Sequence, residues 1–137
     1  MILHKQSLAV NTKYREELKD ITAEVRNFIQ ATNVEEGLLT IFVPHTTAGV
    51  TVNEGADPAV SKDLLYILRK LVPHHDQKYE HYEGNSDAHA KASLLGSSLN
   101  LLVENGELIL GTWQAVFFAE FDGPRQRRVY LSLTGTA

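Results

Sequence analysis

The pattern of apolar and polar side chains predicts three strands in the first half of the chain. Residues 2–10 mix apolar and polar positions before a polar break at Asn11, which is typical of a strand. Residues 38–43 form an apolar, β-rich run before Pro44, and residues 50–52 have the same character. We therefore expect a first strand and, later in the chain, two neighbouring strands.

Helical spacing of apolar side chains predicts three helices. The first starts at Ile21 and is ended by Asn33, the second follows Pro58 on one apolar stripe, and the third covers residues 88–95. Proline at the first helical position costs no hydrogen bond. An aspartate stands at the start of each helix and is expected to cap it; these residues are Asp20, Asp57 and Asp87.

The last third of the chain is rich in β-forming residues. The Asn-Gly pair at 105–106 lies between two apolar runs, which is a strong hairpin signal. Residues 113–121 and 129–133 flank a second turn at 122–124, so we expect an antiparallel meander. The whole pattern predicts an α+β fold with antiparallel or mixed sheets and about three helices, in a single domain over residues 1–137.

Composition narrows the functional classes. The chain has 137 residues, a net charge of −4 and no cysteine, which excludes disulfides, thiolate metal sites and cysteine nucleophiles. No apolar run reaches the roughly 18 residues of a membrane helix, and the start lacks the pattern of a signal peptide. We expect a cytoplasmic protein with no membrane partner. Its mild acidity argues against a nucleic-acid partner.

Histidines are the first candidates for metal-binding residues. Four of the six fall in one stretch, namely His74, His75, His81 and His89. Catalytic zinc often has three protein ligands and a water, and His45, His81 and His89 could supply the three if the fold brings them together. The alternative is that the loop histidines are solvated and that His45 is hydrogen-bonded in the core. We assign the first two of the stretch to a solvated loop.

The start of the third predicted helix is dense in polar side chains, which are Asn85, Ser86, Asp87 and Lys91. Asp87 and Lys91 are one helical turn apart, so one explanation is a capped, solvated helix start with an ion pair. The other explanation is a helix N-terminus that binds an anion or a metal. The spacing by itself leaves both open.

Small polar side chains also surround the two neighbouring strands. Thr46 and Thr47 follow His45 and are either β-formers or hydroxyl donors to a ligand. Asn53 and Glu54 precede the second helix. Glu54 is either a turn or cap residue, or a carboxylate that supports a metal-bound histidine.

The only basic cluster consists of Arg125, Arg127 and Arg128. Arginine forks fit phosphate groups, so in an acidic chain this cluster indicates a small anionic ligand. A solvated turn is the alternative.

Trp113, the sole tryptophan, stands beside Gln114 at the start of a predicted strand. A tryptophan is usually part of the core, but here it could line a pocket or a subunit interface.

Together these segments resemble the YjbQ-like family, which is often labelled secondary thiamine-phosphate synthase. The resemblance covers nearly the whole chain, in order. It is carried by residues 43–49, 53–58, 81–89, 91–96 and 111–114, by Glu120, and by the pair Arg127 and Arg128.

The resemblance implies a compact α+β subunit that assembles as a homotrimer, with a histidine-bearing pocket near a subunit boundary. It implies that His45, His81 and His89 hold a divalent metal such as zinc, with Mg²⁺ as the alternative. It also implies a reaction that joins a pyrimidine diphosphate to a thiazole phosphate and releases pyrophosphate. Three imidazoles suit Zn²⁺ better than Mg²⁺, which is the usual partner of diphosphates.

Residue roles follow from these hypotheses. The residues expected to bind the ligand are Thr46, Thr47, Asn53, Asn85, Ser86, Lys91, Trp113, Gln114, Arg127 and Arg128. The candidate catalytic carboxylates are Glu54, Asp87 and Glu120. Two other functions stay open. One is a zinc-dependent hydrolase of a small phosphorylated metabolite, in which a carboxylate accepts a proton. The other is a non-enzymatic trimer that binds a metal or a small anion.

Overall fold

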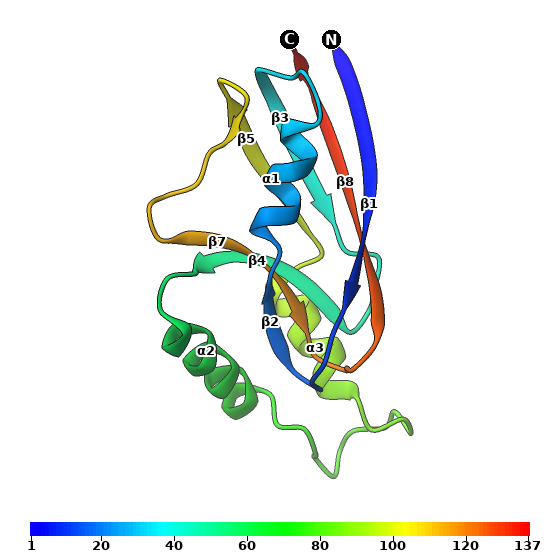
Figure 1. The fold of residues 1–137 in the computed structure, drawn as a ribbon. Helices are drawn as coiled ribbons and strands as arrows, with labels where there is room; N and C mark the ends of the chain where they lie inside the picture. Colours follow the sequence, from blue (N-terminus) through cyan, green and yellow to red (C-terminus); the bar gives the residue numbers. More distant parts are fainter.

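The computed structural model describes all 137 residues, and its strands form two antiparallel sheets (Figure 1). The five-stranded sheet has the order β1 (Ile2–Asn11), β8 (Gln126–Thr136), β3 (Glu36–Phe42), β5 (Ser98–Glu104) and β6 (Glu107–Leu108). The three-stranded sheet has the order β2 (Glu17–Asp20), β7 (Gln114–Glu120) and β4 (Ala48–Glu54). Because β1 and β8 pair along their whole length, the two chain ends lie side by side.

The main core contains 18 buried apolar residues contributed by both sheets and by α1 (Thr22–Gln30). On α1, Val25, Phe28 and Ile29 share one face through their spacing of three and four residues, and all three are buried. Strand β8 buries every second residue from Arg127 to Gly135, so a single arginine shares its inner face with the core.

Two further helices, α2 (Pro58–Leu71) and α3 (Ser86–Leu95), belong to a second and smaller apolar layer. Ala88 and Ala92 of α3 pack with Ala119 and Phe121, and leucines of α2 lie at the edge of this cluster. Strand β7 is therefore buried on both faces, and only its first residue is exposed. This layer brings the start of α3 close to the end of β7.

The predicted fold class and the three helices are confirmed. At the second helix, the Asp57 carboxylate accepts a hydrogen bond from the Ala59 N–H at 2.9 Å, as a cap does. At the first, the Asp20 carboxylate accepts from the Thr22 N–H, although Ile21 holds the cap position. The turn at 105–106 is also confirmed, since both of its residues have positive φ.

Four details of the prediction are wrong. The cap of α3 is Asn85, because Asp87 lies inside the first turn and is fully buried in ion pairs. The first helix ends at Gln30, and the strand Glu17–Asp20 was not predicted. The last third is not a meander, because β7 and β8 belong to different sheets. The predicted apolar stripe of α2 does form, but it is only partly covered, so no residue of that helix is fully buried.

No helix combines the length and the apolar character that crossing a membrane requires.

Candidate functional site: a hollow lined by histidines

Five segments of the chain meet at a hollow of about 470 Å³ whose lining is polar or charged apart from Pro44. We call it the histidine hollow. It is lined by the β3–β4 loop, the loop before α3, α3 itself, the β7–β8 connection and the start of β8; the residues are Pro44, His45, Thr46, Thr47, His81, Glu83, Asn85, His89, Asp122, Arg125 and Arg127. A volume of this size suits a small polar ligand.

Strand register explains why the distant segments meet. Ala48, the first residue of β4, pairs with Glu120, the last residue of β7. The loop before β4 and the connection after β7 therefore leave the three-stranded sheet at the same end. The connection then enters β8 in the other sheet, which places Arg127 beside this end.

Arg127, which lines the hollow, forms an ion pair with the buried carboxylate of Glu120 behind it. Arg127 Nε donates to Glu120 Oε1 at 2.8 Å, and Arg127 Nη2 donates to both Glu120 and the Thr47 hydroxyl. The Thr12 hydroxyl donates to the same carboxylate at 2.8 Å. Burial raises the pKa of Glu120, but the hydrogen bonds from Arg127, the Asp122 N–H and Thr12 outweigh it, so the pKa lies below its usual value.

Charged side chains also anchor α3 behind the hollow. Lys91, which is fully buried, donates from Nζ to Glu16 at 2.6 Å and to Asp87 at 2.9 Å. Arg15 donates to Asp87 from both terminal nitrogens. Burial raises the pKa of Asp87, but these cations lower it more, so the pKa is below its usual value. The predicted pair of Asp87 and Lys91 is confirmed, but it is buried and not solvated.

The three candidate metal ligands all line the hollow, in different arrangements. The rings of His81 and His89 lie 5.5 Å apart, nearly perpendicular to each other. His81 Nε2 is 3.6 Å from Glu83 Oε2. His45 Nε2 accepts a hydrogen bond from the Arg128 backbone N–H at 3.0 Å. Burial lowers the pKa of His45, and the charge of Arg127 lowers it further, so its ring stays neutral at physiological pH.

The three histidines differ in whether their ring nitrogens are available to bind a metal. Only neutral imidazole nitrogens with a free lone pair bind metals. The His89 ring makes no hydrogen bond within the chain, and its centroid lies 5.5 Å from that of His81, so this pair has imidazole nitrogens available to a divalent ion. His45 does not fit as it stands, since its Nε2 lone pair is used by Arg128. Consistent with this, no three metal-binding side chains cluster around one point in the single chain.

Several predicted site residues lie outside the hollow. Asn53, Glu54 and Gln114 lie at the far end of β4 and β7, about 20 Å away by strand length. There, Glu54 accepts from the Ala56 N–H, which is a turn contact. Trp113 is 64% exposed at the same end, so it is not a core residue.

Other predicted residues border the hollow without opening into it. Asp87, Lys91 and Glu120 are fully buried with their charges paired. Ser86 lines a neighbouring hollow with the stacked pair His74 and His75. The Arg128 side chain points to the Ser7 hydroxyl, so only its backbone reaches His45.

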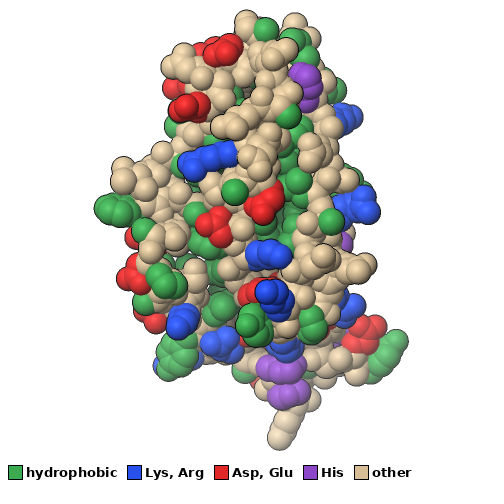
Figure 2. All heavy atoms as spheres, viewed as in Figure 1, with side chains coloured by type: hydrophobic (Ala, Val, Ile, Leu, Met, Phe, Trp, Pro, Cys, Tyr) green, Lys and Arg blue, Asp and Glu red, His purple; other side chains and the backbone are tan.

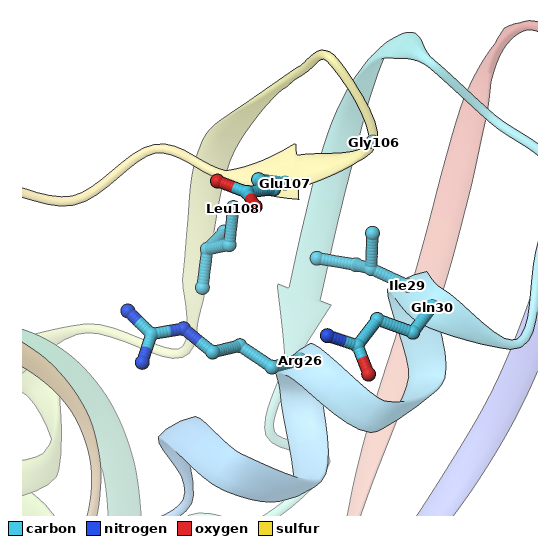
Figure 3. Close-up of a pocket in the computed structure, with 6 residues that line it drawn as sticks. All are labelled: Arg26, Ile29, Gln30, Gly106, Glu107 and Leu108. Carbon is cyan, nitrogen blue, oxygen red and sulfur yellow. The ribbon is translucent and has the colours of Figure 1, made fainter.

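Of two further hollows, one adjoins the histidine hollow and the other lies away from it. One of about 440 Å³ adjoins the histidine hollow and shares His45, Thr46 and His89 with it. Another of about 270 Å³ lies between α1 and the β5–β6 turn, where Arg26 and Glu107 are among its lining residues (Figure 3). It contains none of the predicted site residues. Figure 2 shows basic side chains gathered over the lower half of one face, with histidines at its lower end.

Sequence reasoning missed the residues that support the site. Arg15, Glu16 and Thr12 hold side chains that lie 72 to 108 positions away. No local pattern marks them, because their partners are set by sheet register. Glu83 and Asp122 were also missed, although both lie inside or beside the polar segments that the sequence singled out.

Comparison with known proteins gives one consistent result. A family model described as UPF0047 protein YjbQ-like matches residues 6–136. Among curated relatives, UPF0047 protein YugU of Bacillus subtilis is 48% identical, over 95% of this chain and 98% of the relative. A UPF0047 protein of Methanocaldococcus jannaschii is 48% identical, over 92% of this chain and 91% of the relative.

Solved structures agree in fold. The crystal structure of an uncharacterized conserved YjbQ/UPF0047 family protein from Clostridium acetobutylicum has a TM-score of 0.92 at 46% identity, over 94% of this chain and 99% of that one. A protein of unknown function from Sulfolobus solfataricus has a TM-score of 0.93 at 30% identity, over 98% of this chain and 99% of that one.

Proposed function

The chain belongs to the YjbQ-like UPF0047 family, and from this premise and the histidine hollow we propose that it is an enzyme acting on a small phosphorylated metabolite with the help of a divalent metal. The observation that carries the proposal is one polar hollow lined both by the facing histidines His81 and His89 and by the arginines Arg125 and Arg127. Imidazoles favour zinc, and guanidinium groups favour phosphate.

His81 and His89 are the proposed metal-holding pair. Zinc bound there would stabilise negative charge on a phosphate or on a departing pyrophosphate. In the same hollow, Arg125 holds Asp122 with two of its nitrogens and is 54% exposed, so the rest of its guanidinium is available to an anion. Arg127 is fixed more rigidly, by Glu120 and Thr47.

Glu83 is the carboxylate best placed to accept a proton in the hollow. Its side chain is 53% exposed and lies next to His81. The three carboxylates expected for this role are less accessible or distant: Asp87 and Glu120 are buried in ion pairs, and Glu54 lies at the far end of β4. We therefore assign proton acceptance to Glu83 within this proposal.

The adjoining hollow supports a reaction with two substrates. This hollow of about 440 Å³ shares His45, Thr46 and His89 with the histidine hollow. Two small molecules, one in each hollow, could therefore meet at these residues. The secondary thiamine-phosphate synthase reaction needs two substrates, a pyrimidine diphosphate and a thiazole phosphate. Hydrolysis of one phosphorylated metabolite needs only the first hollow.

The experiment combines metal analysis with product analysis. Purified protein is equilibrated with limiting zinc, and bound metal is measured for wild type, His81→Ala, His89→Ala and the control His75→Ala. We expect wild type and the control to retain zinc and the two variants to lose it, since each removes a ligand. Equal retention by all four proteins would contradict the metal site.

The zinc-loaded protein is then given the pyrimidine diphosphate with and without the thiazole phosphate. Thiamine phosphate formed together with pyrophosphate supports the synthase reaction. Release of inorganic phosphate from a panel of phosphorylated metabolites, independent of the thiazole, supports hydrolysis. If no product forms while zinc and pyrophosphate bind, the protein is a binding protein and the enzymatic proposal is wrong.

A further inference from the structure

The hydrogen bond between His45 and Arg128 fixes where the imidazole proton sits. A backbone N–H can only donate, so the ring nitrogen it contacts at 3.0 Å must carry a lone pair and no proton. In a neutral imidazole the proton is then on the other nitrogen, Nδ1. A doubly protonated ring would oppose an N–H to an N–H, so this contact also disfavours the charged form.

Nδ1–H of His45 is free to bind a ligand. It has no partner within the chain, and it is not buried, since Asn85 Oδ1 is the only buried side-chain polar atom that lacks a partner. His45 lines both the histidine hollow and the adjoining one. The ring therefore presents a donor, not a lone pair, at the junction of the two hollows.

Arg127 offers a second donor beside it. Its Nε and Nη2 are held by Glu120 and Thr47, whereas Nη1 has no partner in the chain. The side chain is only 6% exposed, yet Nη1 is not among the buried unpartnered atoms. Since Arg127 lines the histidine hollow, its one free nitrogen opens there as part of a rigidly held guanidinium.

We propose that His45 Nδ1–H and Arg127 Nη1 form a donor pair for the phosphate oxygens of the ligand, and that His45 is not a metal ligand. The sheet keeps His45 and Arg127 close together. Arg127 and Arg128 are consecutive residues of β8, and the Arg128 N–H binds the His45 ring. Thr46 lines the same hollow. The ligand class rests on the proposed function, whereas the position of the proton on His45 does not.

His45→Asn separates the two roles of the residue. An asparagine amide places an N–H close to the position of Nδ1 but is a poor zinc ligand. If His45 is a donor, His45→Asn keeps zinc affinity and pyrophosphate affinity within about threefold of wild type. His45→Ala keeps zinc but weakens pyrophosphate binding about tenfold or more, the effect of losing a hydrogen bond to a charged group.

Zinc affinity is measured by competition with a chromophoric chelator, and pyrophosphate affinity by calorimetry, with His89→Ala and His75→Ala as references. His89→Ala should lose zinc and His75→Ala should match wild type. Loss of zinc in His45→Asn to the level of His89→Ala would overturn the proposal. Unchanged pyrophosphate affinity in His45→Ala would overturn the donor role.

A spectroscopic measurement tests the proton position independently of binding. Two-dimensional ¹H–¹⁵N spectra of the imidazole groups, assigned with the His45→Asn variant, should show His45 as the neutral Nδ1–H form before and after zinc is added. A proton on Nε2, or a His45 signal that shifts to a metal-bound form, refutes the inference. If wild type binds neither zinc nor pyrophosphate, the proposed function fails while this spectrum still decides the state of His45.

Discussion

Arg127 and Glu120 form an ion pair that is almost completely shielded from solvent, with side-chain exposures of 6% and 0%. Buried charges are tolerated only when they are paired and hydrogen-bonded, and here the carboxylate also accepts from Thr12 and the Asp122 N–H. Arg127 lines the hollow, and its pairing with Glu120 stabilises the fold at the same time. Its energetic contribution should therefore be visible in the response of the protein to acid.

We expect stability to fall as this carboxylate is protonated. The pKa of Glu120 is lower in the folded chain than in the unfolded chain, so its stabilisation is complete above about pH 4.3. It is lost as the pH falls through that value towards the folded pKa. Glu120→Gln should cost about 3–5 kcal/mol near neutral pH because Arg127 loses its charged partner.

Urea unfolding over a series of pH values checks this prediction. Wild type should lose more stability than Glu120→Gln between neutral and acidic pH, so the two curves converge. Glu107→Gln, an exposed carboxylate on β6, is the matched control and should follow wild type. Parallel curves for wild type and Glu120→Gln would show that Glu120 does not contribute to the acid response.

At the scale of elements, α3 is positioned mainly by charge. Its apolar contacts come from two alanines and a partly buried leucine. Such small contacts fix the position of the helix only weakly. The helix is held in place by two ion pairs with the β1–β2 loop. Asp87 pairs with Arg15, and Lys91 pairs with Glu16. Through Arg69 of α2, which pairs with Glu16, the same chain of charges reaches the neighbouring helix. This arrangement places His89 in the hollow.

Removing the buried cation should destabilise the protein strongly. Lys91→Met leaves Asp87 and Glu16 without their shared partner, and breaking such a buried pair costs about 3–5 kcal/mol. Chemical denaturation measures the loss. Lys62→Met on the exposed side of α2 should change stability by less than about 0.5 kcal/mol. A small effect of Lys91→Met would mean that α3 is held by its apolar contacts.

At the scale of the whole molecule, the outer face of the five-stranded sheet exposes apolar side chains on three adjacent strands. Leu38 pairs with Leu102 and Phe42 pairs with Tyr130, and each is 44% to 54% exposed. Strand β7 lies between β2 and β4, so it offers no free edge to a second subunit. The homotrimer implied by the family resemblance therefore needs another apolar surface, and we propose this face.

Leu102→Glu tests the surface. Sedimentation equilibrium of wild type should give about three times the 15.3 kDa mass of one chain, whereas a charge in the centre of the contact should shift the variant towards the single-chain mass. Leu71→Glu, on an exposed position of α2, should leave the assembly unchanged. A wild-type mass of one chain would exclude the trimer, and an unaffected Leu102→Glu trimer would exclude this face.

The sequence by itself determined the features that depend on neighbouring residues. The Asn-Gly turn at 105–106, the Asp57 cap and the helical face of α1 follow from local backbone preferences and apolar spacing. The polar motifs along the chain likewise indicated the family, and the match over residues 6–136 confirms it.

Only the tertiary structure decided which polar residues face the hollow and in what state. Glu54 and Glu120 begin as equivalent candidates, but antiparallel pairing of β4 and β7 places them at opposite ends of one sheet. His45 and Arg128 are 83 positions apart, and their hydrogen bond depends on where β3 ends beside β8. Such contacts depend on strand register and long-range packing, and no local pattern in the sequence encodes them.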